Sequence, residues 1–351
     1  MITIYYHSDA DGKISGGIIY NYEKEFIGNN EDIICIEIDY TDIIDISNID
    51  YNSTVYFVDY SFSIEDNIYA LIDLINTKHC KVIWIDHHKS SQDLLDSGKL
   101  DPIINRREFV RYINTDFCAS YLCYEWTYTK IVGCTIPIEK CPSIIKYVDS
   151  WDTWKHNMPY TIEFNNGFYI QDFLPKEFAD RVIDNDLSFY TKNSKCSDEF
   201  VNDCISKGNI ITKYKEIENA SICKKSSFEF FISNIDDRVI YKCLAINGRG
   251  NSTVFGKLIN DYDIVCLFRY QHNQWVYSLY SNKDYVDCSY IANILGKYEN
   301  LGGGGHKGAA GFQTYSCIID NDCTISFRKI KFLRKLFGEY DIGIMGDDYY
   351  E

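Results

Sequence analysis

Short apolar runs alternate with amphipathic segments over the first third of the chain. Four runs have the length and the β-branched or aromatic content of strands. They span residues 2–6, 32–38, 53–62 and 81–88. Segments with helical spacing follow the first and the third run, at residues 13–26 and 63–77. Strands that alternate with helices predict a mostly parallel, doubly wound α/β sheet.

The rest of the chain predicts a second, smaller α/β domain. Helical spacing continues at residues 117–130 and 141–156. Strand-like runs return at residues 228–234, 239–247, 263–270 and 275–281, with helical segments at 251–260 and 288–298. We therefore expect a first domain at 1–160, a helical connector at 161–230, a second domain at 231–325 and a loose acidic tail at 326–351.

The composition is that of a packed globular protein. The 351 residues are 46% hydrophobic and 25% charged, which favours a folded core over disorder. No apolar run approaches the ~20 residues of a membrane span, and the chain opens directly on a strand-like run, so we expect a cytoplasmic protein without a membrane partner. The 14 cysteines are scattered without a C-x-x-C pair, which predicts reduced, mostly buried thiols.

The net charge of −16 restricts the partners of this protein. Affinity for a long nucleic acid comes mainly from Lys and Arg side chains that neutralise phosphates, so we expect no groove for a long strand. A short RNA or a small nucleotide remains compatible with this charge if metal ions offset the field locally. No interface signature is evident, and the sequence leaves open whether the chain forms a homodimer.

Acidic and imidazole side chains stand at the ends of three predicted strands. They are His7, Asp9, Asp11, Asp59, Asp86, His87 and His88. Alternate positions of a strand project to one side, and open parallel sheets bind ligands outside the carboxyl ends of their strands. Each fragment alone is commonplace in proteins, but their joint occurrence in this order predicts a single site.

So many carboxylates in one place repel one another unless cations hold them together. A pair of divalent metal ions that share a bridging carboxylate, ~3.5–4 Å apart, meets this need. Mixed imidazole and carboxylate donors favour Mn²⁺, with Mg²⁺ or Co²⁺ as substitutes. Such a pair activates a water and neutralises a phosphoryl oxygen during an in-line displacement.

The stretches HSDADG (7–12), FVDYSF (57–62) and WIDHHKS (84–90) resemble, in this order, the motif series of the DHH phosphoesterase superfamily. A fourth motif of that superfamily is an Asp on a later helix, often within D-x-W, and the stretch YVDSWDTWKH (147–156) supplies it. Asp152 matches this motif best, while Asp149, about one helical turn earlier, competes with it. The motif spacing is most similar to the oligoribonuclease, or nanoRNase, branch.

The resemblance implies a role for each motif residue. The ligands implied for one metal ion are His7, Asp9 and Asp59. Those implied for the second are Asp11, Asp59, His87 and Asp152. Asp59 would therefore bridge the two ions. Asp86 would orient the neighbouring imidazoles, and His88 would point to the scissile phosphate or the leaving oxygen.

A further resemblance lies downstream, where DYVDCSYIANILGKYENLGGGGHKGAAGF (284–312) is similar to the DHHA1 domain that follows the catalytic domain in many members. Glycines let the backbone amides approach an anion closely. The residues implied for substrate binding are Gly302, Gly303, Gly304, Gly305, His306 and Lys307.

One position departs from the family pattern. Relatives often carry a phosphate-binding arginine where this chain has Tyr280, and a tyrosine brings no positive charge. Lys283, Arg249 or Lys307 would then substitute for it. The loop at 247–252 is either a helper for nucleotide binding or an ordinary turn with an N-cap.

Together the two resemblances imply a metal-dependent enzyme. The leading hypothesis is a Mn²⁺-dependent 3′–5′ exonuclease that releases 5′-mononucleotides from short RNA oligomers. Two alternatives with the same metal chemistry are a 3′-phosphoadenosine 5′-phosphate phosphatase and a cyclic-dinucleotide phosphodiesterase. An alternative of another class is a catalytically silent nucleotide-binding protein.

Overall fold

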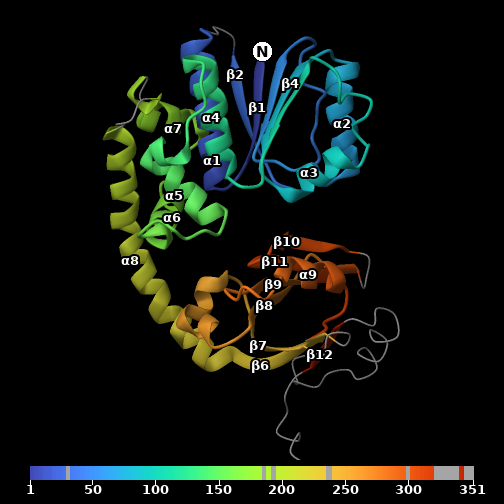
Figure 1. The fold of residues 1–351 in the computed structure, drawn as a ribbon, viewed down its shortest axis with the longest axis vertical. Coiled ribbons are helices and arrows are strands. Elements are labelled where there is room, and N and C mark those ends of the chain that lie inside the picture. The colour runs from blue at the N-terminus through green and yellow to red at the C-terminus, as the bar shows by residue number, and fades with distance from the viewer. Residues whose placement is uncertain are drawn as a thin grey trace, which may run out of the picture. The chain divides into compact units, whose positions relative to one another are not determined.

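The chain, described by a computed structural model, folds into two compact units, Met1–Thr212 and Lys213–Glu351. The structure describes residues 1–28, 32–183, 187–190, 195–234, 239–297, 301–319 and 340–343. Each unit combines a β-sheet with helices (Figure 1), so the expected two-domain α/β class is confirmed. The domain limits expected from the sequence remain predictions.

A five-stranded parallel sheet forms the centre of the first unit, with the strand order β2-β1-β3-β4-β5. The strands are β1 (Ile2–His7), β2 (Ile33–Ile38), β3 (Thr54–Val58), β4 (Lys81–Asp86) and β5 (Phe109–Ile113). β1, β3 and β4 are buried along almost their whole length, as expected for a parallel sheet with helices on both faces. These three strands are neighbours, so their carboxyl ends meet at one edge.

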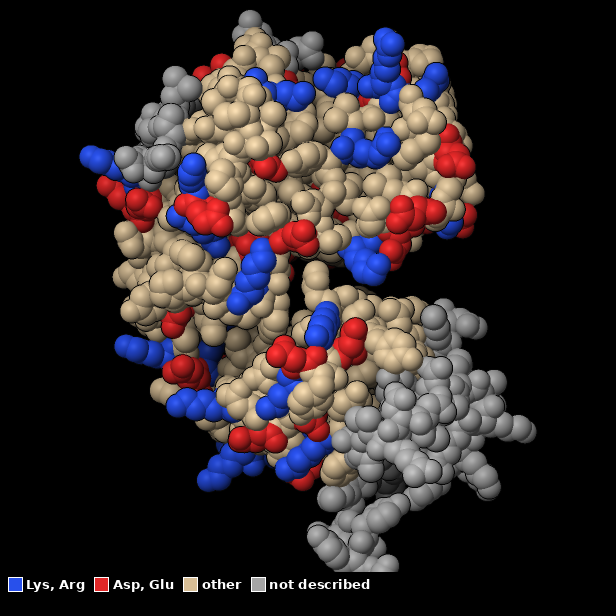
Figure 2. Space-filling view, in the orientation of Figure 1, with Lys and Arg blue, Asp and Glu red and all other residues tan. Residues whose placement is uncertain are grey.

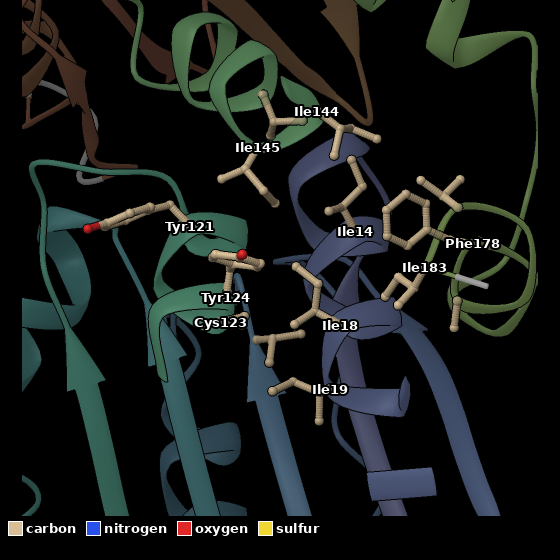
Figure 3. Close-up of a cluster of buried hydrophobic side chains, with 14 of the residues drawn as sticks. Ile14, Ile18, Ile19, Tyr121, Cys123, Tyr124, Ile144, Ile145, Phe178 and Ile183 are labelled. Atoms are coloured by element: carbon tan, nitrogen blue, oxygen red, sulfur yellow. The ribbon is translucent and has the colours of Figure 1, made fainter. Parts of the chain in front are cut away.

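Helices cover both faces of this sheet. They are α1 (Ala10–Asn21), α2 (Glu65–Asn76), α3 (Lys89–Asp96), α4 (Ala119–Val132), α5 (Ser143–Asp152), α6 (Thr161–Tyr169) and α7 (Pro175–Phe178). On one face, Ile14 and Ile18 of α1 pack with Tyr124 of α4 and Phe178 of α7 (Figure 3). On the other face, Leu71 of α2 belongs to a separate buried cluster. The first cluster fixes α1 and α4, and the second fixes α2, against the strands that end in the candidate ligands.

The second unit contains a seven-stranded, mostly antiparallel sheet with the order β10-β11-β9-β8-β7-β6-β12. Its strands are β6 (Ser227–Asn234), β7 (Val239–Asn247), β8 (Ile264–Gln271), β9 (Gln274–Tyr280), β10 (Gly303–His306), β11 (Ala309–Thr314) and β12 (Tyr340–Gly343). Only β7 and β8 pair in parallel. The long helix α8 (Lys195–Ser226) ends in this unit, and α9 (Cys288–Lys297) packs on β10 and β11.

Two expectations for the second unit need correction. The predicted helix at 251–260 is a 3-10 segment, Ser252–Asn260, which is broken at Gly256 because that residue has a φ of 51°. The predicted loose tail lies outside the described residues except for β12, which pairs antiparallel with β6. This short piece of the tail is therefore part of the sheet.

The cysteines and the helices agree with the composition. The cysteines whose side chains the structure describes are all free, and most of them are buried, so the expectation of unpaired thiols is confirmed for them.

Within the described ranges, no helix combines the length and the apolar character needed to cross a membrane. On the face drawn in Figure 2, Lys and Arg side chains are interspersed with Asp and Glu.

Candidate metal centre

The first group of candidate ligands lies where β1 passes into α1. Asp9 is the N-cap of α1, and its side chain accepts a hydrogen bond from the Gly12 amide at 3.0 Å. A Cβ on Gly12 would lie 2.2 Å from the carbonyl oxygen of His7, so only glycine allows the helix to begin this close to the strand. Nδ1 of His7 lies 3.1 Å from an Asp9 oxygen. The glycine of the motif thus serves close packing.

Asp59 stands at the centre of the site. It follows β3 with a φ of 54°, a left-handed conformation that Asp tolerates better than most residues. Its carboxylate oxygens lie 3.8 Å from Nδ1 of His7, 3.4 Å from Nε2 of His87 and 3.9 Å from Nδ1 of His88. The residue is almost completely buried. Three imidazoles therefore surround one buried carboxylate.

The two histidines of the Asp-His-His stretch at the end of β4 contact different residues. Nε2 of His87 lies 3.1 Å from an Asp152 oxygen and 3.8 Å from an Asp11 oxygen. Nδ1 of His88 lies 2.8 Å from an Asp86 oxygen. Asp86 is fully buried and also accepts a hydrogen bond from the Ser91 hydroxyl, so its geometry suits an orienting role.

The structure separates the two aspartates that compete for the fourth motif. Asp152, at the end of α5, lies beside His87. Asp149 instead accepts hydrogen bonds from the Cys118 amide at 3.0 Å and from Nζ of Lys155 at 2.8 Å. The geometry therefore favours Asp152 as the candidate ligand.

Among the residues that the structure describes, three groups of side chains could hold a metal ion, and within each group the donor atoms lie within 4.8 Å of one another. The groups are His7, Asp9 and Asp59; Asp11, His87 and Asp152; and Asp59, Asp86, His87 and His88. The first equals the ligand set implied for one ion. The second equals the set implied for the other ion without Asp59, which lies 3.4 Å from His87.

Unpaired buried atoms fit the presence of metal ions at these groups. Both Asp59 oxygens and Nδ1 of His87 are buried and have no hydrogen-bond partner among the described residues. A buried, unpaired charge costs several kcal/mol, and a cation would remove that cost. A cavity of about 20 Å³ beside Asp9, Asp11 and Asp152 leaves room for a small ion or a water.

Burial and mutual repulsion shift the pKa values of the carboxylates in this site. Burial, with the charges of Asp9 and Asp11, raises the pKa of Asp59 well above its usual value. Burial and Asp152 likewise raise the pKa of Asp11 to about 7. Burial acts to lower the pKa of His87, but the carboxylates of Asp152 and Asp59 raise it well above its usual value. The site thus carries excess negative charge that protons relieve in part.

Two features of the site have no counterpart in the sequence prediction. The carboxylate of Asp11 accepts hydrogen bonds from the amides of Ala119 and Ser120, both at 2.7 Å, at the N-terminus of α4. The hydroxyl of Tyr40 lies 3.0 Å from Nε2 of His88. Tyr40 follows the end of β2 by two residues, so the rule that located the other residues, proximity to a carboxyl strand end, also applies to it.

The residues implied for substrate binding lie in the second unit. The glycine run forms the edge strand β10, which pairs with β11. A Cβ on Gly303 would lie 2.2 Å from the Ala292 carbonyl oxygen, and one on Gly305 would lie 2.6 Å from the Ala309 carbonyl oxygen. These two glycines therefore have a packing reason of their own. A Cβ on Gly302 or Gly304 would meet no such clash, although Gly302 has a positive φ of 75°. The role of the whole run, with His306 and Lys307, in substrate binding stays a prediction.

The structure also describes Tyr280, where the chain departs from the family pattern, and the cationic residues proposed to substitute for an arginine there. Tyr280 ends β9, and Nζ of Lys283 donates to the Asn260 carbonyl oxygen at 2.9 Å. Arg249 is exposed. The side chain of Asn251 caps the 3-10 segment by accepting from the Thr253 amide at 3.1 Å, so the loop at 247–252 contains the N-cap that the sequence allowed.

No family model matches the chain. The uncharacterized protein R106 of Acanthamoeba polyphaga mimivirus is 23% identical over 330 residues, which is 88% of this chain and 66% of the relative. The chain thus spans slightly less than two thirds of this curated relative.

Two solved structures are similar over almost the whole chain. An uncharacterized protein from Helicobacter pylori has a TM-score of 0.37 and 14% identity, covering 96% of this chain and 99% of that chain. A pGpG-specific phosphodiesterase, PggH from Vibrio cholerae, has a TM-score of 0.48 and 14% identity, covering 95% and 98%. Both scores are too low to support a conclusion about the activity of this chain.

Proposed function

We propose that this protein is a metal-dependent phosphoesterase of the DHH type. The observation that carries the proposal is the convergence of donors from three neighbouring strand ends and from α5 around Asp59. Burying these charged groups without a partner would destabilise the fold, which a structural protein would have no reason to accept. Two divalent cations, preferably Mn²⁺, suit this donor set.

The candidate ligands form one group for each of the two cations. His7 and Asp9 would hold one cation, and His87 and Asp152 would hold the other with Asp11. Asp59 lies close to both groups, 3.8 Å from Nδ1 of His7 and 3.4 Å from Nε2 of His87. The cations, when bound, supply a reactive water and neutralise a phosphoryl oxygen.

Residues next to the cations act on the substrate and on each other. Asp86 fixes the ring of His88 through Nδ1, and His88 contacts the phosphoryl or the leaving oxygen.

The proposed substrates are short oligoribonucleotides, which the enzyme shortens from the 3′ end to 5′-mononucleotides. The net charge of −16 disfavours a long strand. A short substrate needs few phosphate contacts beyond the cations themselves. The edge strand β10 with Lys307 is the proposed region for holding the end of the substrate.

A fluorescent trinucleotide with Mn²⁺ tests the proposal. The protein should degrade it, and Asp59→Ala should not. Asp93→Ala, at an exposed position of α3 paired with Lys89, is a matched control and should retain full activity. Full activity of Asp59→Ala would contradict the assignment of Asp59.

A substrate panel separates the proposed activity from its alternatives. The panel runs from a dinucleotide to long single strands of RNA and DNA, with 3′-phosphoadenosine 5′-phosphate and cyclic dinucleotides. A preference above about tenfold, ~1.4 kcal/mol in transition-state binding, identifies the class. Two Mn²⁺ per chain by elemental analysis without any turnover would favour a catalytically silent nucleotide-binding protein.

A further inference from the structure

Tyr40 lies at the same edge of the sheet as the candidate ligands. Its ring packs between two others, with its centroid 4.6 Å from the ring of His7 and 5.9 Å from the ring of Tyr60, to which it is nearly parallel. The hydroxyl of Tyr40 lies 3.0 Å from Nε2 of His88. The tilted contact with His7 and the stacked contact with Tyr60 fix the tyrosine ring, so the direction of its hydroxyl is set by packing.

The His88 ring is held at both of its nitrogens. Nδ1 bonds to the buried carboxylate of Asp86 at 2.8 Å, and Asp86 is itself held by the Ser91 hydroxyl. Nε2 bonds to Tyr40. A rotation of the imidazole would break both bonds at once, and a hydroxyl can either donate or accept, so its bond persists whichever atom carries the proton.

We propose that Tyr40 is a positioning residue that, together with Asp86, holds the His88 ring in one orientation beside the position of the substrate phosphoryl group. The statement about the phosphoryl group rests on the proposed function. The statement that Tyr40 orients the His88 ring rests on the contacts of Tyr40 alone. The active histidine is thus supported from β4 through Asp86 and from the end of β2 through Tyr40.

The variant Tyr40→Phe tests the proposal because it removes the hydroxyl and keeps the stacked ring. Tyr60→Phe is the matched control, since Tyr60 belongs to the same stack but its hydroxyl accepts from the Asn67 amide. The first measurement is the Nε2 nitrogen resonance of His88, assigned by its loss in His88→Asn. It is recorded on metal-free and Mg²⁺-loaded protein, because Mn²⁺ broadens nearby signals.

The resonance should shift in Tyr40→Phe and stay unchanged in Tyr60→Phe. An unchanged resonance in Tyr40→Phe would overturn the proposal, whether or not the protein degrades any nucleotide. This readout therefore separates failure of the proposal from failure of the proposed function.

Kinetics supply the second measurement. Loss of one hydrogen bond should lower kcat about fivefold to tenfold, with an unchanged number of bound Mn²⁺ ions and little change in KM. If Tyr40 acts through His88, the variant that combines Tyr40→Phe with His88→Asn should have the same kcat as His88→Asn alone. Additive losses would show that Tyr40 acts independently of His88 and would contradict the proposed role.

Discussion

Nε2 of His87 lies 3.1 Å from a carboxylate oxygen of Asp152, although the two residues come from the end of β4 and the end of α5. This contact adds α5 to a site whose other residues lie at strand ends and at the start of α1. It also places Asp152, and not Asp149, beside the other candidate ligands. The assignment of Asp152 as the ligand of the fourth motif can therefore be tested by replacing each aspartate.

Asp152→Asn and Asp149→Asn should have opposite effects. Asp152 is partly exposed, so its loss should leave the melting temperature of the metal-free protein almost unchanged but lower metal affinity and activity about 10-fold to 100-fold. Asp149→Asn weakens the bonds to Lys155 and the Cys118 amide, so it should lower the melting temperature and keep two bound Mn²⁺. Loss of metal in Asp149→Asn alone would reverse the assignment.

Asp59→Asn should stabilise the metal-free protein and abolish its response to Mn²⁺. The buried Asp59 carboxylate has a raised pKa because of burial, Asp9 and Asp11, so its ionised form destabilises the fold near neutral pH. The amide removes that charge but cannot bridge two cations. Thermal unfolding with EDTA and with Mn²⁺ measures both effects, and activity should fall more than about 100-fold.

The metal-free protein should become less stable as the pH rises from about 5 to about 8. The pKa of Asp11 is raised to about 7 by burial and Asp152, and that of His87 is raised by nearby carboxylates that outweigh its burial. A raised folded-state pKa contributes stability that is complete below the unfolded-state pKa, and this stability is lost as the pH rises through the folded-state pKa. Urea unfolding at several pH values checks the slope, which saturating Mn²⁺ should reduce. A slope of the opposite sign would contradict the crowding of these groups.

Gly12→Ala should destabilise the first unit far more than Gly133→Ala. A Cβ at position 12 would meet the His7 carbonyl oxygen at 2.2 Å, so α1 would have to move away from β1 at a cost above about 3 kcal/mol. Gly133 has a positive φ but nothing within 4 Å of a Cβ, so its replacement should cost about 1 kcal/mol. Denaturant unfolding compares the two variants directly.

Gly304→Ala and Gly303→Ala separate binding from packing in the glycine run. A Cβ at position 303 would meet the Ala292 carbonyl oxygen at 2.2 Å, whereas at position 304 the nearest atom is the Asn293 side-chain nitrogen at 4.0 Å. Gly303→Ala should therefore unfold the second unit at a lower temperature. Gly304→Ala should keep the melting temperature, and a raised KM in that variant would support the anion-binding role.

The sequence indicates the candidate ligands because strand ends are local features. An apolar run followed by Asp or His identifies Asp59 and His87 without knowledge of the tertiary structure, and the parallel sheet then brings them together. The D-x-W motif favours Asp152 over Asp149, but one turn of helix separates the two residues, and the packing of α5 decides which one faces His87.

Other features depend on contacts between distant segments. No local pattern indicates that the α4 amides of Ala119 and Ser120 bind Asp11. The glycine run was interpreted through anion binding alone, but the packing of α9 explains Gly303 equally well. The break at Gly256 arises from a single backbone angle, which the helical spacing of its neighbours conceals.

The donors around Asp59 come from β1, the start of α1, the ends of β3 and β4, and α5, and no one of these segments supplies a complete set. A chain that is still folding therefore presents only fragments of the site to a cation. Metal ions that bind at these groups would therefore bind late, once the strands have paired. They would stabilise the folded chain and would not nucleate its folding.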